Sequence, residues 1–283
     1  MSGILEWIVE LIRRIFGDTT RAVVLGESVC CPLFWRDANG KIRSTWDYLA
    51  MSAAEQQRVR SWVKDRTHAD ETPAIAFLLT PNGPGGNLFL RFPDELNDAA
   101  VEAAEAALQD LARDGIAAIA TLYTDDATPR WWDIGPHIAG WRQLDKRIGK
   151  LFSAAALSIE SNEGVRSMEQ LTRCLDAVRE AFPGVKEVGT HLQWNGGSEF
   201  SAYRWTSYQT TPLNLEFVLV ENSWHPAEGD RRGVAGLKQE CEIIMTRIPR
   251  GRLIWHEYNL APDGKTLDAQ RVYLRGTGTR GLG

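Results

Sequence analysis

The sequence lacks the features that mark several large classes of protein. Its 283 residues carry 32 basic and 37 acidic side chains, a net charge of −5, so the basic excess of most nucleic-acid-binding proteins is missing. We therefore expect no nucleic acid among its partners. Hydrophobic residues make up 43% of the chain and charged residues 24%. These values are close to the average of folded globular proteins, which excludes a largely disordered or fibrous chain.

Cysteine is scarce, and its spacing does not suit a metal site. The four cysteines are Cys30, Cys31, Cys174 and Cys241, and no two of them form a CxxC pair. On a strand, the adjacent Cys30 and Cys31 would point to opposite faces and so would not chelate one ion. We expect small buried side chains in a reducing compartment, and we predict neither a metal nor a cofactor.

Residues 1–17 contain an apolar stretch that four charged residues interrupt: Glu6, Glu10, Arg13 and Arg14. The stretch therefore resembles neither a secretion signal nor a membrane span, and the expected location is the cytoplasm or a carried particle. Its large apolar residues recur at helical spacing: Ile4, Trp7, Ile8, Leu11, Ile12 and Ile15. This pattern predicts an amphipathic helix, which packs on the protein itself or docks on a protein partner through residues 3–16.

Strand-like and helical segments alternate from residue 73 onward. The strand-like segments are 73–80, 116–126, 154–164, 185–194, 213–226 and 251–262. The helical segments between them are 94–115, 137–152, 167–184 and 231–249. Such alternation predicts a parallel sheet covered by helices, and the strands are far enough apart for βαβ units of about 30 residues or more.

The chain before residue 73 completes this pattern. Residues 21–35 supply one or two strands, residues 38–41 predict a hairpin or loop turn, and residues 53–65 predict a helix. Seven strands are then clear, and residues 271–276 are the candidate for an eighth. We predict one α/β domain over residues 18–283, a (β/α)8 TIM-barrel-like fold with an irregular or incomplete eighth unit. An open doubly wound sheet is the alternative, although no glycine-rich nucleotide loop follows the first strand.

Chemically useful side chains collect where the predicted strands end, which is where parallel barrels hold their sites. Nine aromatic or imidazole side chains lie at or just past these ends. They are four of the five histidines, His137, His191, His225 and His256, and five of the eleven tryptophans, Trp131, Trp132, Trp194, Trp224 and Trp255. Glu163 and Glu257 end strands three units apart. Two carboxylates facing across a pocket are what retaining glycoside cleavage requires, one as proton donor and one as nucleophile. Flat aromatic faces stack on sugar rings, and polar side chains bind their hydroxyl groups.

Residues 137–163 resemble the fourth-strand region of clan A glycoside hydrolases, which are retaining enzymes on a (β/α)8 barrel. The helix reads WRQLDKRIG, which is similar to the family's WxxLxxRxG-like pattern, and the strand exit reads SIESNE. The resemblance implies that Glu163 is the acid/base and that Asn162 holds the sugar 2-hydroxyl group. It also implies that Glu257, in LIWHEYN, is the nucleophile, with His225 of the SWHP segment near it.

The resemblance extends over residues 73–262 and implies a carbohydrate partner. The further substrate-binding residues that we predict lie at strand exits: Asp125, Trp132, His191, Trp194, Trp224 and Tyr258. Asp125 also suits a helix N-cap. Two nearby glutamates are rivals for the catalytic roles, Glu160 for the acid/base and Glu221 for the nucleophile. The family places an arginine at an early strand end, and residues 73–83 contain none.

The sequence leaves three functions open. The first is a glycoside hydrolase that uses Glu163 and Glu257. The second is a catalytically inactive carbohydrate-binding or structural barrel in a larger assembly, for example a phage tail; the missing arginine favours it. The third is a metal-dependent hydrolase with ligands from a set of three histidines and one aspartate: His191, His225, His256 and Asp125. No HxH or HExxH spacing supports the third.

Overall fold

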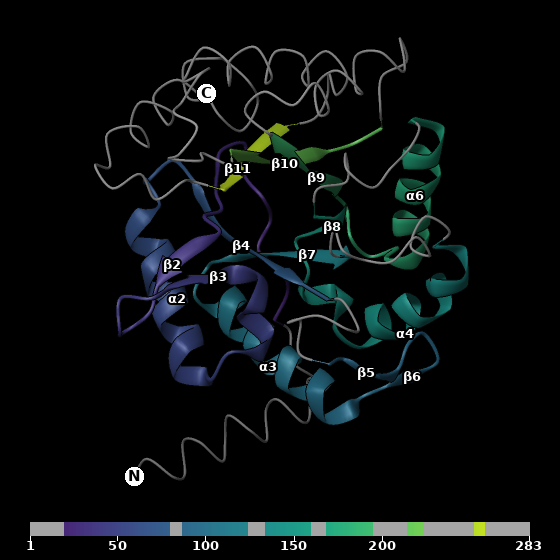
Figure 1. Ribbon diagram of the computed structural model, residues 1–283, viewed down its shortest axis with the longest axis horizontal. Coiled ribbons are helices and arrows are strands. Elements are labelled where there is room, and N and C mark those ends of the chain that lie inside the picture. The colour runs from purple at the N-terminus through teal and green to yellow at the C-terminus, as the bar shows by residue number, and fades with distance from the viewer. Residues whose placement is uncertain are drawn as a thin grey trace.

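The computed structural model describes residues 20–79, 87–123, 134–159, 168–194, 214–222 and 252–257. The predicted amino-terminal helix, the predicted helix 231–249 and the candidate eighth strand 271–276 lie outside these ranges. Within the described part, helices surround a central sheet (Figure 1). None of the helices described there combines the length and the apolar character that crossing a bilayer requires.

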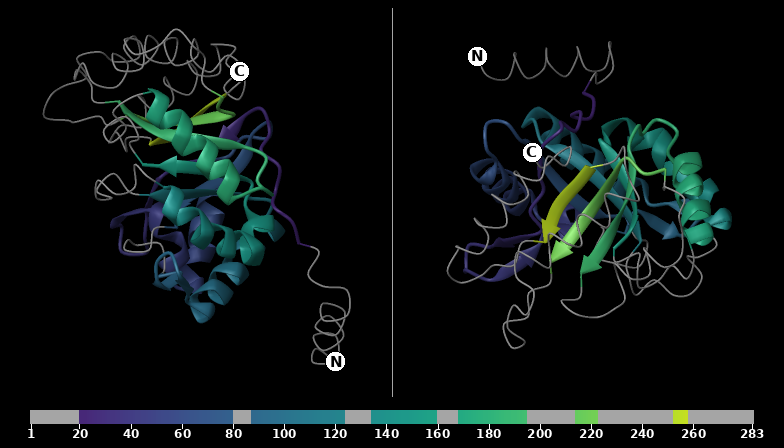
Figure 2. Two further views of the ribbon diagram at one scale, coloured as in Figure 1. Left: turned by 90° about the vertical axis from the view of Figure 1, so that its right-hand side faces the viewer. Right: turned by 90° about the horizontal axis from the view of Figure 1, so that it is seen from above.

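Among the described residues, seven strands form the main sheet, and all of their pairings are parallel. In spatial order they are β1 (Val29–Cys30), β4 (Thr72–Leu78), β7 (Ala117–Tyr123), β8 (Ala154–Ser158), β9 (Val188–Trp194), β10 (Phe217–Asn222) and β11 (Arg252–Glu257). Spatial order follows chain order, as it does when successive βα units build a barrel. Figure 2 shows β9, β10 and β11, coloured green to yellow, side by side in the view from above. The predicted parallel α/β barrel is confirmed.

The two edges of this sheet meet, so the barrel is nearly closed. Leu33, just after β1, donates its backbone N–H to the carbonyl oxygen of His256 in β11 at 2.9 Å. Toward the amino ends of the same strands, the Arg252 guanidinium donates to the carbonyl oxygen of Gly26 at 2.7 Å. β11 therefore lies against the first strand segment directly, and among the described residues no eighth strand separates the two.

In the part of the chain that the structure describes, four α-helices cover the outer face of the sheet: α2 (Ala53–Arg66), α3 (Asp98–Arg113), α4 (Ile138–Ile148) and α6 (Met168–Ala181). Helix α3 shows why the sequence folds this way. The Asn97 side chain accepts the Ala100 N–H at its start, and Gly115, with φ +73°, follows its end. Its buried face repeats every three or four residues: Val101, Ala104, Leu108 and Leu111. The four helices confirm the predicted segments 53–65, 94–115, 137–152 and 167–184.

Short elements occupy the loops at the carboxyl ends of the strands. After β1, the strands β2 (Phe34–Arg36) and β3 (Ile42–Ser44) form a hairpin around the predicted turn at residues 38–41. After β4, the strands β5 (Phe89–Arg91) and β6 (Glu95–Leu96) form a second hairpin. In the described part of the chain, the 3-10 helices η1 (Thr45–Ala50) and η3 (Gly135–His137) also lie in these loops, whereas η4 (Gly149–Leu151) lies between α4 and the start of β8. The second hairpin corrects our helix boundary, because residues 95–96 are a strand and α3 begins after Asn97.

Small and large side chains complement each other inside the barrel. Alternate residues of each strand face inward, and on β4, β7 and β8 most of these are alanines: Ala74, Ala76, Ala117, Ala154 and Ala156. Large side chains from other segments fill the space they leave: Leu25, Leu33, Trp46, Phe217 and Leu219. The interior is therefore a packed core at this level, not a channel.

Replacing Gly189 with alanine is expected to lower the free energy of unfolding by about 1–3 kcal/mol. A Cβ at Gly189 would lie 2.4 Å from the backbone oxygen of Phe217 and 2.6 Å from its ring. Phe217 is fully buried on the neighbouring strand β10, so it has little room to move. Denaturant unfolding measures the change. Gly184→Ala is the control, since a Cβ there meets nothing within 4 Å. Equal stability of the two variants would contradict this packing.

Candidate functional site

The described interior of the barrel changes character along its axis. Toward the amino ends of the strands it is apolar. Toward the carboxyl ends it contains fully buried polar side chains: Thr121, Ser158, His191 and His256. Burying a polar group costs free energy unless a partner compensates it, so polar residues are uncommon in such a core. Because parallel barrels hold their sites at the carboxyl ends of the strands, this polar half marks the candidate site.

Two histidines and a tryptophan form the centre of this polar half, the Trp46–His191–His256 cluster. The rings of His191 on β9 and His256 on β11 are 5.7 Å apart and perpendicular. Trp46, from η1, packs edge-on against both rings, with centroids 5.8 Å from His191 and 4.6 Å from His256. The cluster therefore joins three barrel units that are far apart in the sequence.

The Trp46–His191–His256 cluster carries no charge at neutral pH. Burial lowers the pKa of His256 to about 4, and a hydrogen bond to the Cys31 carbonyl opposes this shift only partly. Burial lowers the pKa of His191 well below its ordinary value, and the nearby His256 lowers it further. Burial also raises the pKa of the Cys31 thiol, whose sulfur lies 3.4 Å from His256 Nδ1. A charged catalytic group at this end must therefore come from other residues.

The structure also bears on the cysteines and on the metal site considered as an alternative. Cys30 and Cys31 do point to opposite sides of the first strand: Cys31 faces the barrel interior, and the Cys30 thiol lies 3.8 Å from the Arg66 carbonyl of α2. In the part of the chain that the structure describes, no three His, Cys, Asp or Glu side chains are grouped closely enough to hold a metal ion. Asp125 and His225, two of the four candidate metal ligands, lie outside that part.

The structure places Glu257 and its rival Glu221 at paired positions of the sheet. Glu257 is the last residue of β11, and its backbone pairs with that of Glu221 on β10. The pairing shifts register between Val220 and Glu221, so it is an irregularity in β11 that brings the two glutamates level. Trp194, another predicted site residue, ends β9 and pairs with Asn222.

The other predicted site residues follow strand ends and lie outside the described residues: Asp125, Trp132, Asn162, Glu163, Trp224, His225 and Tyr258. Glu163 comes five residues after Ser158, the last residue of β8. In the spatial order of the sheet, β9 and β10 separate β8 from β11. The two strands that lead to Glu163 and Glu257 are thus well apart around the nearly closed barrel.

Trp46, like Thr121 and Ser158, belongs to this region and was not singled out from the sequence. It lies in the loop after the first strand, just beyond the β2–β3 hairpin, and only 8% of its side chain is exposed. Its place in a strand-exit loop was a usable signal, because the other tryptophans were singled out on the same ground. Its contacts with His191 and His256 depend on closure of the barrel, which no local pattern reveals.

The helix positions that carry the family resemblance hold α4 in place. Trp141 is fully buried, and its Nε1–H donates to the Tyr123 hydroxyl at the end of β7 at 2.8 Å. Burial raises the pKa of Tyr123, so this hydroxyl stays protonated. Leu144 is also fully buried, and Arg147 donates to Asp98 of α3 at 2.7 Å. In this chain the three positions serve packing between α3, α4 and the sheet.

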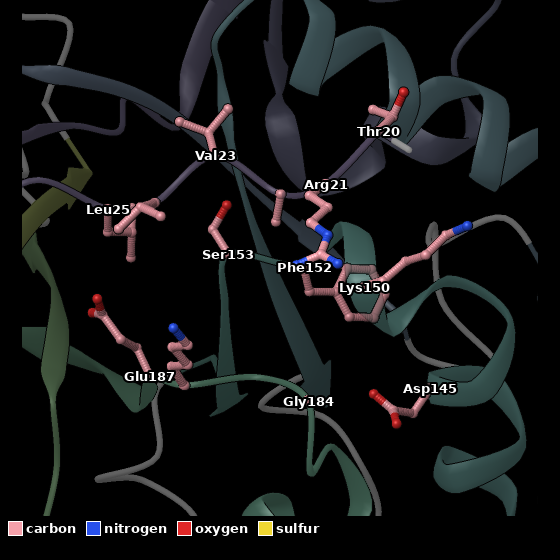
Figure 3. Close-up of a pocket in the computed structure, with 13 residues that line it drawn as sticks. Thr20, Arg21, Val23, Leu25, Asp145, Lys150, Phe152, Ser153, Gly184 and Glu187 are labelled. Atoms are coloured by element: carbon pink, nitrogen blue, oxygen red, sulfur yellow. The ribbon is translucent and has the colours of Figure 1, made fainter. Parts of the chain in front are cut away.

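The opposite end of the barrel has a pocket of about 730 Å³ (Figure 3). It is lined by residues 20–25, which precede β1, and by residues just before β8 and β9: Lys150, Phe152, Ser153, Lys186 and Glu187. These segments all lead into strands, so the pocket lies at the amino ends. In parallel barrels that end usually serves stability, not catalysis. Glu187 is accordingly engaged in an ion pair with Arg252 at 2.9 Å.

No protein-family model and no curated protein sequence matches this chain. Solved structures do match its fold. The β-glycosidase BGL167 has a TM-score of 0.56 at 10% identity, over 77% of this chain and 71% of its own. Endo-glycoceramidase II from Rhodococcus sp., in complex with a cellobiose-like imidazole, has a TM-score of 0.54 at 11% identity, over 86% and 73%. The β-glucosidase 1317 has a TM-score of 0.52 at 12% identity, over 89% and 84%. The chain therefore has a parallel α/β barrel of the kind that glycosidases have.

Proposed function

We propose that this protein binds a carbohydrate at the carboxyl end of its barrel and cleaves a glycosidic bond with retention of configuration. The observation that carries the proposal is the position of Glu257 at the end of β11, in a barrel of glycosidase type. Glu163 follows β8, which lies three strand positions away in the sheet. A pair of carboxyl groups placed across a barrel mouth suits a substrate that sits between them.

The two glutamates take different roles in this reaction. The Glu163 carboxylic acid gives its proton to the glycosidic oxygen while the bond from that oxygen to the anomeric carbon breaks. The Glu257 carboxylate bonds to the same carbon, which gives a covalent glycosyl-enzyme. Glu163 then takes a proton from water as the water attacks this carbon, and Glu257 leaves as a carboxylate. The product keeps the configuration of the substrate because the carbon is inverted twice.

Residues around the barrel mouth would hold the sugar in place. We assign Asn162 to the 2-hydroxyl group, and we assign sugar contacts to the remaining predicted residues: Asp125, Trp132, His191, Trp194, Trp224, His225 and Tyr258. Of these, His191 lies inside the barrel against Trp46 and has a fully buried ring. The reaction uses two carboxyl groups and water, and it requires no cofactor.

A panel of aryl glycosides tests the role of Glu163. On a substrate with a good leaving group, Glu163→Ala should slow formation of the glycosyl-enzyme only slightly, because departure of that group needs little proton donation. Added azide should then raise turnover and yield a glycosyl azide, since it attacks the glycosyl-enzyme without needing a base. Glu160→Ala is the matched control in the same segment, and azide should not change its rate. Rescue of Glu160→Ala by azide, and not of Glu163→Ala, would assign the acid/base to Glu160.

The second candidate function is a carbohydrate-binding or structural barrel without catalysis. It is favoured by residues 73–83, which contain no arginine where the resembled family has one at an early strand end. Glycan binding by the parent protein, with no turnover on the whole panel of glycosides, is the result that this candidate predicts.

A further inference from the structure

His256 immediately precedes Glu257 on β11, and its ring is completely buried. Its Nδ1 atom lies 2.9 Å from the carbonyl oxygen of Cys31. A carbonyl oxygen accepts hydrogen bonds and donates none, so Nδ1 carries the proton and donates it. The ring of His256 is thereby tied to the chain just beyond β1.

The backbone of the same residue makes a second tie to that segment. The His256 carbonyl oxygen accepts the N–H of Leu33 at 2.9 Å. We call the two bonds, from the His256 ring to Cys31 and from Leu33 to the His256 carbonyl, the His256 clip. These two bonds hold both the His256 side chain and the peptide group that leads into Glu257. The clip therefore fixes both the position and the orientation of the backbone at this point.

The clip supports the side of β11 that faces the first strand segment, where no strand among the described residues pairs with β11. On its other side, β11 pairs with β10 until the register shifts between Val220 and Glu221, beside the Glu257 pairing. An irregular ladder at a strand end holds that end less firmly than a regular one. The rings of Trp46 and His191 pack on His256 from inside the barrel and keep its imidazole in place.

We propose that His256 is a positioning residue: the His256 clip holds the carboxyl end of β11 so that Glu257 keeps its reactive geometry. This inference rests on the proposed function, because it gives Glu257 the role of nucleophile. Misplacing a reacting group by about 1 Å costs about 100-fold in rate. Loss of the clip should therefore lower kcat strongly and leave KM nearly unchanged.

Three variants of His256 separate the effect of the hydrogen bond to Cys31 from the effect of changing the size of the side chain. In His256→Asn the amide nitrogen takes the place of Nδ1 and still donates to Cys31, so kcat should stay within a few-fold of the parent. His256→Gln moves the donor further along the side chain, and His256→Leu removes it; both should lower kcat on an aryl glycoside by about 100-fold. Hydrogen exchange of the Leu33 amide should quicken in these two variants and stay slow in His256→Asn. The exposed His68 supplies the control His68→Asn, which should change neither quantity.

The outcomes distinguish the clip from the proposed function. An active parent with the same kcat in all three His256 variants would overturn the positioning role and leave the proposed function intact. A loss of kcat that follows the melting temperature equally in all three would also overturn it, because the role would then be structural alone. A parent protein without turnover on any glycoside would overturn the proposed function, and the positioning role with it.

Discussion

Replacing Glu257 with glutamine is expected to reduce turnover of an aryl glycoside by at least about 1,000-fold, with folding preserved. The amide has nearly the shape of the carboxylate but does not attack the anomeric carbon, so no glycosyl-enzyme forms. Steady-state hydrolysis measures the loss, and circular dichroism with thermal unfolding verifies the fold.

Glu221→Gln is the matched control for this prediction. The backbones of Glu221 and Glu257 pair across β10 and β11, so both substitutions replace a glutamate at paired positions of the sheet. We expect Glu221→Gln to retain most of the turnover. If Glu221→Gln abolished turnover and Glu257→Gln retained it, the nucleophile would be Glu221.

The buried histidines should make the protein lose stability as the pH falls from about 6.5 to about 4. An unfolded histidine binds a proton near pH 6.5, whereas folded His256 binds one only near pH 4. The unfolded state therefore holds more protons in this window, and the free energy of unfolding decreases as the pH is lowered through it. Below about pH 4 both states are protonated, and the contribution of His256 stops growing. Its total is on the order of 3 kcal/mol, at about 1.4 kcal/mol for each pH unit.

Denaturant unfolding of the parent and of His256→Asn at pH 7.5 and 4.5 measures this contribution. Asparagine does not titrate, so the loss of stability between the two pH values should be smaller in the variant. The His68→Asn variant is the control, because it makes the same replacement at a histidine that is exposed to solvent. Equal pH dependence of the parent and His256→Asn would show that His256 is not kept neutral by burial.

The barrel could be predicted because its signals are local and repeated. Apolar runs such as residues 73–80 and periodic helices such as residues 94–115 each mark one element, and their alternation implies parallel pairing. The β5–β6 hairpin was missed because its strands have three and two residues, too few for a recognisable pattern. Its second strand also lies directly before the cap of α3, so it was assigned to that helix.

The candidate site could be predicted less completely, since its contacts join distant segments. The sequence placed His191 and His256 at strand ends and assigned His191 to the substrate. No local pattern signals their mutual contact inside the barrel, where Trp46 packs against both rings. The clip from His256 to Cys31 and Leu33 spans more than 220 residues and depends on closure of the sheet.

The separation of the Glu163 and Glu257 carboxyl groups in a crystal structure tests the central claim most directly. Retaining cleavage requires the two groups to face each other at about 5–5.5 Å across an open pocket at the carboxyl end of the barrel. We predict that separation. A separation of about 6.5–9.5 Å would indicate inversion in place of retention. Carboxyl groups on different faces of the sheet would contradict the glycosidase account altogether.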